Sequence, residues 1–203
     1  MMHFDYSLRR RIILGIVISL TIILYIVEDF FSPIRLLSKI GLIVIFYVVD
    51  HLFDARFKPR HYIFIVILGI AGFVLSPLYF KYSSYDKILH FLSPILFCSI
   101  AFHLINKLSL KKSWKLIFTF FVVIGGIGVF EISEYALDLV FDLKLQGVFL
   151  KEIIEGKIHY TVISNSLDDT MVDMVFGILG AGIYTISRAI KKSNIKNQKR
   201  IQK

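Results

Sequence analysis

The sequence lacks the short signatures that mark well-known enzyme classes. It has no G-x-S-x-G nucleophile elbow and no H-E-x-x-H zinc helix. The Gly-x-Gly-Asp motif of intramembrane aspartyl proteases and the Glu-Glu-x-x-x-Arg motif of prenyl-protein-type membrane proteases are also absent, as is the Arg/His pattern of membrane lipid phosphatases. Its one cysteine, Cys98, cannot form an internal disulfide, so cysteine usage indicates no redox compartment.

The sequence consists instead largely of long apolar runs. Hydrophobic residues make up 56% of the 203 residues, and the mean hydropathy is +0.71. Both values exceed what a soluble domain needs, since roughly 45–50% apolar residues is typical even with glycine counted. A helix needs about 20 mostly apolar residues to cross a bilayer. Six stretches qualify, at residues 12–27, 37–53, 62–80, 88–105, 114–140 and 170–190.

The sequence therefore predicts an all-α membrane protein, built as a bundle of six transmembrane helices. No cleavage site follows the first run, so we expect that run to be retained as a helix. We expect a single transmembrane domain over residues 1–190 and a basic cytoplasmic tail over 191–203. The long connection 141–166 is too charged to span and too apolar to be a free loop, which favours an interfacial or re-entrant segment between the fifth and sixth helices.

The basic residues set the expected orientation. The net charge of +9 does not indicate nucleic-acid binding, because most of the 24 lysines and arginines alternate with the apolar runs on one side and in the tail. By the positive-inside rule this richer side is cytoplasmic, so both termini are expected there, in the plasma membrane. The other side carries only Arg35, Lys39, Lys81, Lys87, Lys144, Lys151 and Lys157.

Ionisable groups gather at the outer ends of the last three predicted helices. Asp86 and His90 are four residues apart, and so share one helix face. Glu131, Glu134 and Asp138 form a second stripe, and Asp169 and Asp173 form a third. Ionisable residues inside membrane segments are costly and indicate function by default. Like charges so placed repel one another, which favours proton uptake or the recruitment of a cation.

Several of these acids also have a purely structural interpretation. Ser166 and Asp169 fit a helix-start pattern, so Asp169 could serve as a cap, and Asp168 could favour the helix dipole. Asp86 could cap its own helix, and Asp138 could simply reach headgroup water. At the cytoplasmic end, Asp50 and Asp54 are expected to be interface residues or partners of Arg56. Glycines in the last two helices are expected to permit close packing; they are Gly125, Gly126, Gly128, Gly177, Gly180 and Gly182.

The residues deepest in the helices carry the functional hypothesis. His90, Glu131 and Asp173 are the predicted catalytic residues, and Asp86, Glu134 and Asp169 the predicted binding residues. A divalent metal ion is the cofactor that such a cluster would suit. Its predicted ligands are His90, Glu131, Glu134, Asp169 and Asp173.

Three sequence blocks carry a resemblance to a known family. They are Tyr-Asp-Lys-Ile-Leu-His at 85–90, Glu-Ile-Ser-Glu at 131–134 and Asp-Asp-Thr-Met-Val-Asp-Met at 168–174. Together these blocks resemble the YjdF-like family of small prokaryotic membrane proteins, and more distantly the VanZ-like family. The first resemblance implies no established activity. The second implies a link to the cell envelope and to tolerance of glycopeptide antibiotics.

Three functions compete on this evidence. The first is an outer-leaflet site that binds or modifies a lipid or cell-envelope precursor. The second is a cation- or proton-coupled transporter, which needs polar groups near the midplane. The third is a non-catalytic membrane partner that uses the cluster for docking. Membrane lipids are the expected partners; the sequence indicates neither a protein partner nor a substrate.

Overall fold

The computed structural model describes residues 6–27, 33–141 and 143–201, and these are helical apart from one small sheet. By its internal contacts the chain divides into two compact units, Met1–Ser76 and Pro77–Lys203. The last helix, α6 (Ser166–Ile201), continues as a helix through most of the predicted tail. The prediction of a single domain over residues 1–190 stays a prediction.

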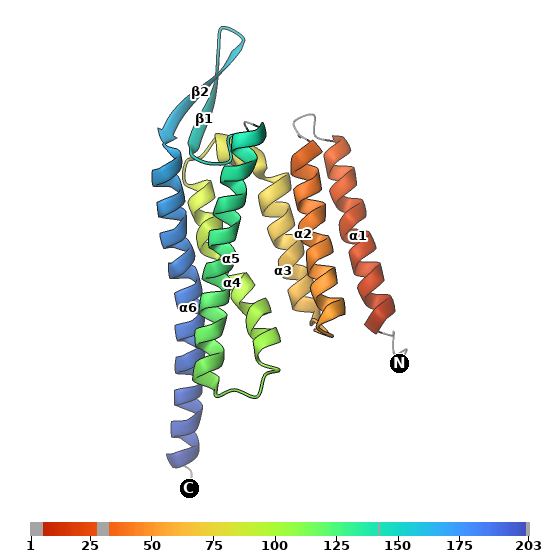
Figure 1. Cartoon of the computed structure of the whole chain (residues 1–203), viewed down its shortest axis with the longest axis vertical. Helices are drawn as coiled ribbons and strands as arrows, with labels where there is room; N and C mark the ends of the chain where they lie inside the picture. Colours follow the sequence, from red (N-terminus) through yellow and green to blue (C-terminus); the bar gives the residue numbers. More distant parts are fainter. Residues whose placement is uncertain (1–5, 28–32, 142, 202–203) are drawn as a thin grey trace. The chain divides into compact units, whose positions relative to one another are not determined.

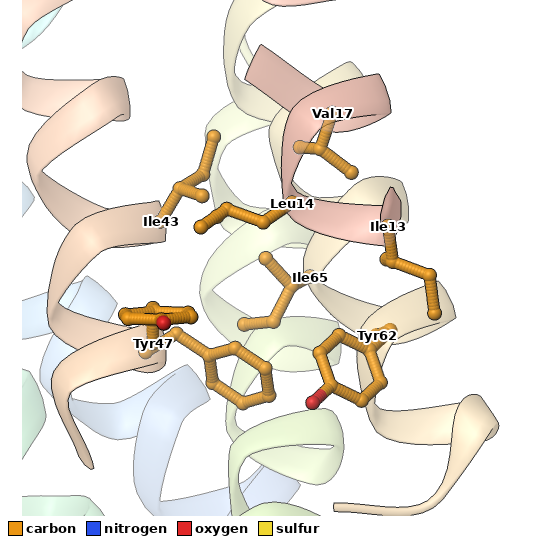
Figure 2. Close-up of a pocket in the computed structure, with 8 residues that line it drawn as sticks. Ile13, Leu14, Val17, Ile43, Tyr47, Tyr62 and Ile65 are labelled. Atoms are coloured by element: carbon orange, nitrogen blue, oxygen red, sulfur yellow. The ribbon is translucent and has the colours of Figure 1, made fainter. Parts of the chain in front are cut away.

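The first unit contains α1 (Tyr6–Val27), α2 (Pro33–Leu52) and α3 (Pro59–Gly69). A proline begins both α2 and α3, where its missing N–H would have no helical partner in any case. Leu14, Ile43 and Ile65, from the three helices in turn, line a small apolar hollow in this unit (Figure 2). Phe46 stacks on Phe57 beside it, with ring centroids 4.4 Å apart.

The predicted helix over residues 62–80 is not a single α-helix. After α3 the helix first widens into a π-helical stretch η1 (Ile70–Val74) and then tightens into a 3₁₀ stretch η2 (Ser76–Phe80). The Leu75 N–H donates to the Ile70 carbonyl at 3.0 Å, five residues back, which is the π-type bond. Pro77 follows, and a proline can neither donate to the preceding turn nor avoid its carbonyl. Regular α-helix therefore stops before it.

The second unit packs α4 (Tyr85–Ile105), α5 (Lys112–Phe141) and α6 against one another (Figure 1). Cys98, Val123 and Ala181, one from each helix, form the buried centre of this packing. α4 remains one helix through Pro94, which is buried. At the start of α5, Lys112 Nζ donates to the Arg188 carbonyl at 2.7 Å and so ties α5 to α6.

The outward faces of the helices are apolar, as a lipid environment requires. Phe121, Ile132, Leu139 and Ile186 are each more than 60% exposed. Exposed apolar surface of this extent marks a membrane or partner surface. Within the described residues, three helices are long and apolar enough to cross a membrane, Tyr85–Ile105, Lys112–Phe141 and Ser166–Lys191. The predicted count of six spans therefore stays a prediction.

The connection between α5 and α6 is a β-hairpin, where an interfacial or re-entrant segment was predicted. Strands β1 (Val148–Ile154) and β2 (Lys157–Ser164) pair antiparallel and extend beyond the ends of α5 and α6 (Figure 1). Glu155 and Gly156 form the turn with φ of 51° and 74°. Positive φ at both central residues is the tight turn whose twist matches a hairpin. Two β-branched runs separated by Glu-Gly were the sequence signal for this element.

Candidate functional site

The three helices of the second unit bring the predicted acids and His90 to one end of the unit. Asp86 and His90 lie in the first two turns of α4, and Asp169 and Asp173 in the first two turns of α6. Glu131 comes from the last third of α5. This end carries the hairpin and lies opposite the C-terminus (Figure 1). We call Asp86, Lys87, His90, Glu131, Glu134, Asp169 and Asp173 the ionisable cluster.

Lys87 is the centre of the cluster, and sequence reasoning had counted it only as a loop charge. Its Nζ donates to Asp173 Oδ1 at 2.9 Å, to Asp86 Oδ2 at 3.2 Å, and to Asp169 Oδ1. The Lys87 side chain is 15% exposed, and those of Asp169 and Asp173 are 5% and 2% exposed. One lysine therefore forms ion pairs with carboxylates from two helices. The site that they form is almost closed to solvent.

His90 lies between the two halves of the cluster. Its Nε2 is 3.5 Å from Asp86 Oδ1 and 3.9 Å from Asp173 Oδ2. Its Nδ1, on the other edge of the ring, is 3.5 Å from Glu131 Oε1. Each ring nitrogen thus faces a carboxylate, and the side chain is only 12% exposed. An imidazole so placed can pass a proton from one carboxylate group to the other.

Glu131 is a buried acid of the cluster, and one of its two carboxylate oxygens lacks a hydrogen-bond donor among the described residues. The residue is 4% exposed, and its Oε1 accepts no hydrogen bond from the part of the chain that the structure describes. A buried acceptor without a donor is rare in folded proteins, and it calls for a specific explanation. Glu134, one helical turn further along α5, belongs with His90 and Glu131 to one of two groups whose ligand atoms lie within 4.8 Å of one another.

The segment before the hairpin closes one edge of the cluster. The backbone N–H groups of Leu145 and Gln146 donate to the Asp138 carboxylate at 2.8 and 2.7 Å. The next N–H, of Gly147, donates to Asp169 Oδ2 at 2.7 Å. Asp138 thus holds this loop, and its contact with headgroup water stays a prediction. The Asp169 carboxylate is therefore held at one oxygen by the Gly147 N–H and at the other by Lys87.

The cap of α6 also differs from the sequence expectation. Asn165, not Ser166, begins the helix: its Oδ1 accepts from the Asp168 N–H at 2.9 Å, and its Nδ2 donates to Asp168 Oδ2 at 2.7 Å. This reciprocal pair is a capping arrangement. Asp169 is consequently not needed as a cap and turns inward to Lys87. Asp86 likewise contacts Lys87 and His90, so its role is not confined to a cap.

Two glycines allow the helices to approach closely enough to form the cluster. A Cβ at Gly180 would lie 2.2 Å from the Phe91 carbonyl oxygen of α4, and one at Gly177 would lie 2.7 Å from an Ile127 methyl of α5. The close-packing prediction therefore applies to these two positions. It is wrong for the other four glycines, because a Cβ there would meet nothing within 4 Å in the described structure; they are Gly125, Gly126, Gly128 and Gly182.

A second buried acid lies in the first unit, where sequence reasoning expected only an interface residue. Asp50 is 1% exposed and accepts hydrogen bonds from the Tyr6 hydroxyl at 2.7 Å and the Tyr62 hydroxyl at 3.1 Å. It does not pair with Arg56, which instead contacts Asp54 at 3.2 Å on the surface. Asp50 thus ties α1 to α2 and α3.

All six predicted site residues lie in the cluster, although the catalytic, binding and metal roles assigned to them stay predictions. The role of Lys87 was missed because two of its partners, Asp169 and Asp173, lie on another helix, more than 80 residues away in sequence. The one local signal was its place between Asp86 and His90 on an apolar helix. A lysine in that setting needs a counter-ion.

The apolar helices and their outward-facing apolar surface define the chain as a helical membrane protein. Residues 7–194 match the family described as predicted membrane protein (DUF2238), and the chain belongs to this family. The family is the YjdF-like one, so that resemblance is confirmed, whereas similarity to VanZ-like proteins is not shown. No curated protein and no solved structure shows significant similarity to the chain.

Proposed function

We propose that the chain is a multi-pass protein of the plasma membrane with both termini in the cytoplasm and the hairpin outside. The distribution of lysine and arginine supports this orientation. In the second unit, the connection between α4 and α5 holds Lys107 and Lys111, with Lys112 and Lys115 in the first turn of α5. The cluster then lies on the outer side, within about two turns of the starts of α4 and α6 and about three turns before the end of α5.

The orientation can be tested by cysteine labelling in intact cells, because the native Cys98 is fully buried. Lys157→Cys, at the exposed start of β2, is expected to react with a membrane-impermeant maleimide in intact cells. Ser109→Cys, in the exposed α4–α5 connection, is expected to react only after permeabilisation. The reverse pattern would overturn the proposed topology.

The proposed function is that the cluster binds, and acts on, the headgroup of a lipid or cell-envelope precursor in the outer leaflet. The observation that carries it is the convergence of Asp86, His90, Glu131, Asp169 and Asp173 around Lys87 at one end of three apolar helices. A charged side chain at the centre of a membrane helix costs about 2.5–3.5 kcal/mol on insertion scales. A purely structural contact would be cheaper with apolar residues, so such a concentration favours a functional site.

The distribution of polarity favours a one-sided site over a transporter. Beyond the cluster, the described centre of the second unit is apolar and is formed by Cys98, Val123 and Ala181. The buried hydroxyl of Thr119 donates to the backbone carbonyl of Lys115, one turn back on its own helix. A transport route requires polar groups that continue past the midplane. Headgroup chemistry requires them only at the depth where lipid phosphates and sugars lie.

His90 is the candidate acid or base at this site. Each of its nitrogens faces a carboxylate, and the side chain is nearly closed to water. General acid–base catalysis needs a titratable group within reach of the reacting proton, and histidine fills this role most often. We propose that Asp173 and Asp86 orient the imidazole and that Lys87 holds these two acids in place.

Lipid analysis of the purified protein tests this function. Wild-type protein extracted in a mild detergent is expected to carry one headgroup class enriched by about tenfold over the bulk membrane. A tenfold enrichment corresponds to a binding free energy that one set of polar contacts can supply. His90→Ala and Asp173→Asn are expected to lose the enrichment. Glu152→Gln, on the exposed part of the hairpin, is the matched control and should retain it.

A wild-type lipid profile equal to that of the bulk membrane would contradict the proposal. So would an enrichment that persists in variants that elute as folded protein. A stoichiometric protein partner, retained by the wild type and lost with the same variants, would favour the docking function instead. Uptake of an ion into vesicles that depends on His90 would favour transport.

A further inference from the structure

The ionisable cluster contains two groups of side chains that could each hold a cation. One is Asp86, His90 and Asp173, and the other is His90, Glu131 and Glu134; within each group the ligand atoms lie within 4.8 Å of one another. His90 is common to both, so a single ion could occupy one group or the other. The contacts of the two groups differ, and the difference decides between them.

Lys87 already forms ion pairs with both carboxylates of the first group. Its ammonium contacts Asp86 at 3.2 Å and Asp173 at 2.9 Å. A divalent ion bound to those carboxylates would lie within a few ångströms of this ammonium. The repulsion of like charges at such a distance is on the order of several kcal/mol in a partly buried site. Binding of a metal ion by the aspartates of the cluster is therefore unfavourable.

The second group contains one carboxylate oxygen that has no hydrogen-bond donor among the described residues. Glu131 Oε1 is buried, accepts no hydrogen bond from the described residues, and faces His90 Nδ1 at 3.5 Å. The Glu131 side chain is 5% exposed, so water does not reach it freely. Because a buried carboxylate oxygen is costly without a partner, a positive charge between it and the imidazole would resolve the deficit.

The surroundings of His90 match those of a metal-binding histidine. Such a histidine usually directs its second ring N–H at a carboxylate, which fixes the tautomer and strengthens the ligating nitrogen. Here Nε2 faces Asp86 Oδ1 at 3.5 Å, which leaves Nδ1 directed at Glu131. Asp86 is itself held by Lys87, so the support continues outward from the ring.

We propose that His90, Glu131 and Glu134 bind one divalent transition-metal ion, such as Zn²⁺, through Nδ1 of His90 and one carboxylate oxygen from each glutamate. One nitrogen and two oxygens suit zinc or manganese better than calcium or magnesium, which prefer oxygen alone. Three protein ligands leave a coordination position for water or an oxygen of the bound headgroup. That last assignment rests on the proposed function, and with the ion bound, the ion-bound water takes the acid–base role proposed there for His90. The ion site itself does not rest on that function.

Metal binding to the purified full-length protein tests the proposal without any lipid. After removal of metals with a chelator, wild-type protein in detergent is expected to bind about one Zn²⁺ per chain, as a three-ligand site would. Co²⁺ in its place should give the visible absorption of a low-coordinate nitrogen–oxygen site. Glu131→Gln and His90→Ala should each weaken binding by about 100-fold or more, and Asp86→Asn by about tenfold as an outer-shell change.

Glu152→Gln is the matched carboxylate control and should bind as the wild type does. A folded wild-type protein that binds no Zn²⁺ or Mn²⁺ overturns the proposal. Binding that survives both His90→Ala and Glu131→Gln overturns it too, as does an equal loss in Asp173→Asn, which would put the ion on the first group. If Glu131→Gln does not fold, Glu134→Gln provides the same comparison.

The two proposals fail in different ways. Lipid enrichment in a protein that binds neither Zn²⁺ nor Mn²⁺ would leave the headgroup function standing and remove the metal. Stoichiometric zinc without lipid enrichment would leave the metal and remove the headgroup function.

Discussion

Lys87→Met is expected to lower the free energy of unfolding by about 3–5 kcal/mol, the cost of leaving buried charges without their partner. Lys87 is the common partner of Asp86, Asp169 and Asp173, and the two α6 aspartates have almost no access to water. Without the ammonium, three carboxylates from two helices would repel one another. Unfolding of the purified protein in detergent, followed by circular dichroism, measures the loss.

Two further variants separate this electrostatic effect from a loss of packing. Lys157→Met removes an exposed lysine of the hairpin and should change stability by no more than about 0.5 kcal/mol. Adding Asp169→Asn and Asp173→Asn to Lys87→Met removes most of the repulsion and should recover part of the lost stability. If the triple variant is no more stable than Lys87→Met, the ion pairs are not what stabilises this end of the unit.

Gly180→Ala is expected to destabilise the second unit by about 1–3 kcal/mol or more, the range for overpacking a closely packed interface. The new methyl would lie 2.2 Å from the Phe91 carbonyl oxygen, and a backbone atom cannot rotate away as a side chain can. α4 and α6 must therefore separate, and they carry Lys87 and its aspartate partners. The midpoint of thermal unfolding in detergent measures the effect.

Gly182→Ala is the matched control on the same helix, because a methyl there would meet nothing within 4 Å. It should be neutral or stabilise the protein by about 0.4–1 kcal/mol, since alanine has less conformational freedom to lose on folding. Equal midpoints for the two variants would show that the close approach of α4 and α6 at Gly180 is absent. Metal and lipid binding should fall in Gly180→Ala alone, because only that change displaces the cluster.

The sequence predicted which residues form the cluster, but it predicted few of the contacts that these residues make. The spacing of Asp86 with His90, and of Asp169 with Asp173, assigns each pair to one helix face from local geometry alone. Helix spacing could not predict that Asp169 turns inward. It depends on Asn165 taking the cap, on the Gly147 N–H meeting one oxygen, and on Lys87 meeting the other.

The hairpin and the break after α3 were missed for different reasons. Charges spaced through apolar residues suggested a segment lying at the membrane surface, and the Glu155-Gly156 turn signal was overlooked. Over residues 62–80, hydropathy was uniform, so composition could not reveal where the backbone hydrogen bonds change pattern. The chain leaves the α-helix at Gly69, before it reaches Pro77.

The sequence by itself determined that this is a helical membrane protein, because in lipid every backbone polar group must be satisfied within its own segment, so long apolar runs become helices. It also determined which faces of α4, α5 and α6 carry charge, since helical periodicity is local. Only the tertiary structure decided that Lys87 pairs with the aspartates and that Glu131 Oε1 faces His90 with no donor among the described residues. Those relations depend on how closely three helices pack at Gly177 and Gly180, and packing distance is a property of side chains brought together from far apart in the chain.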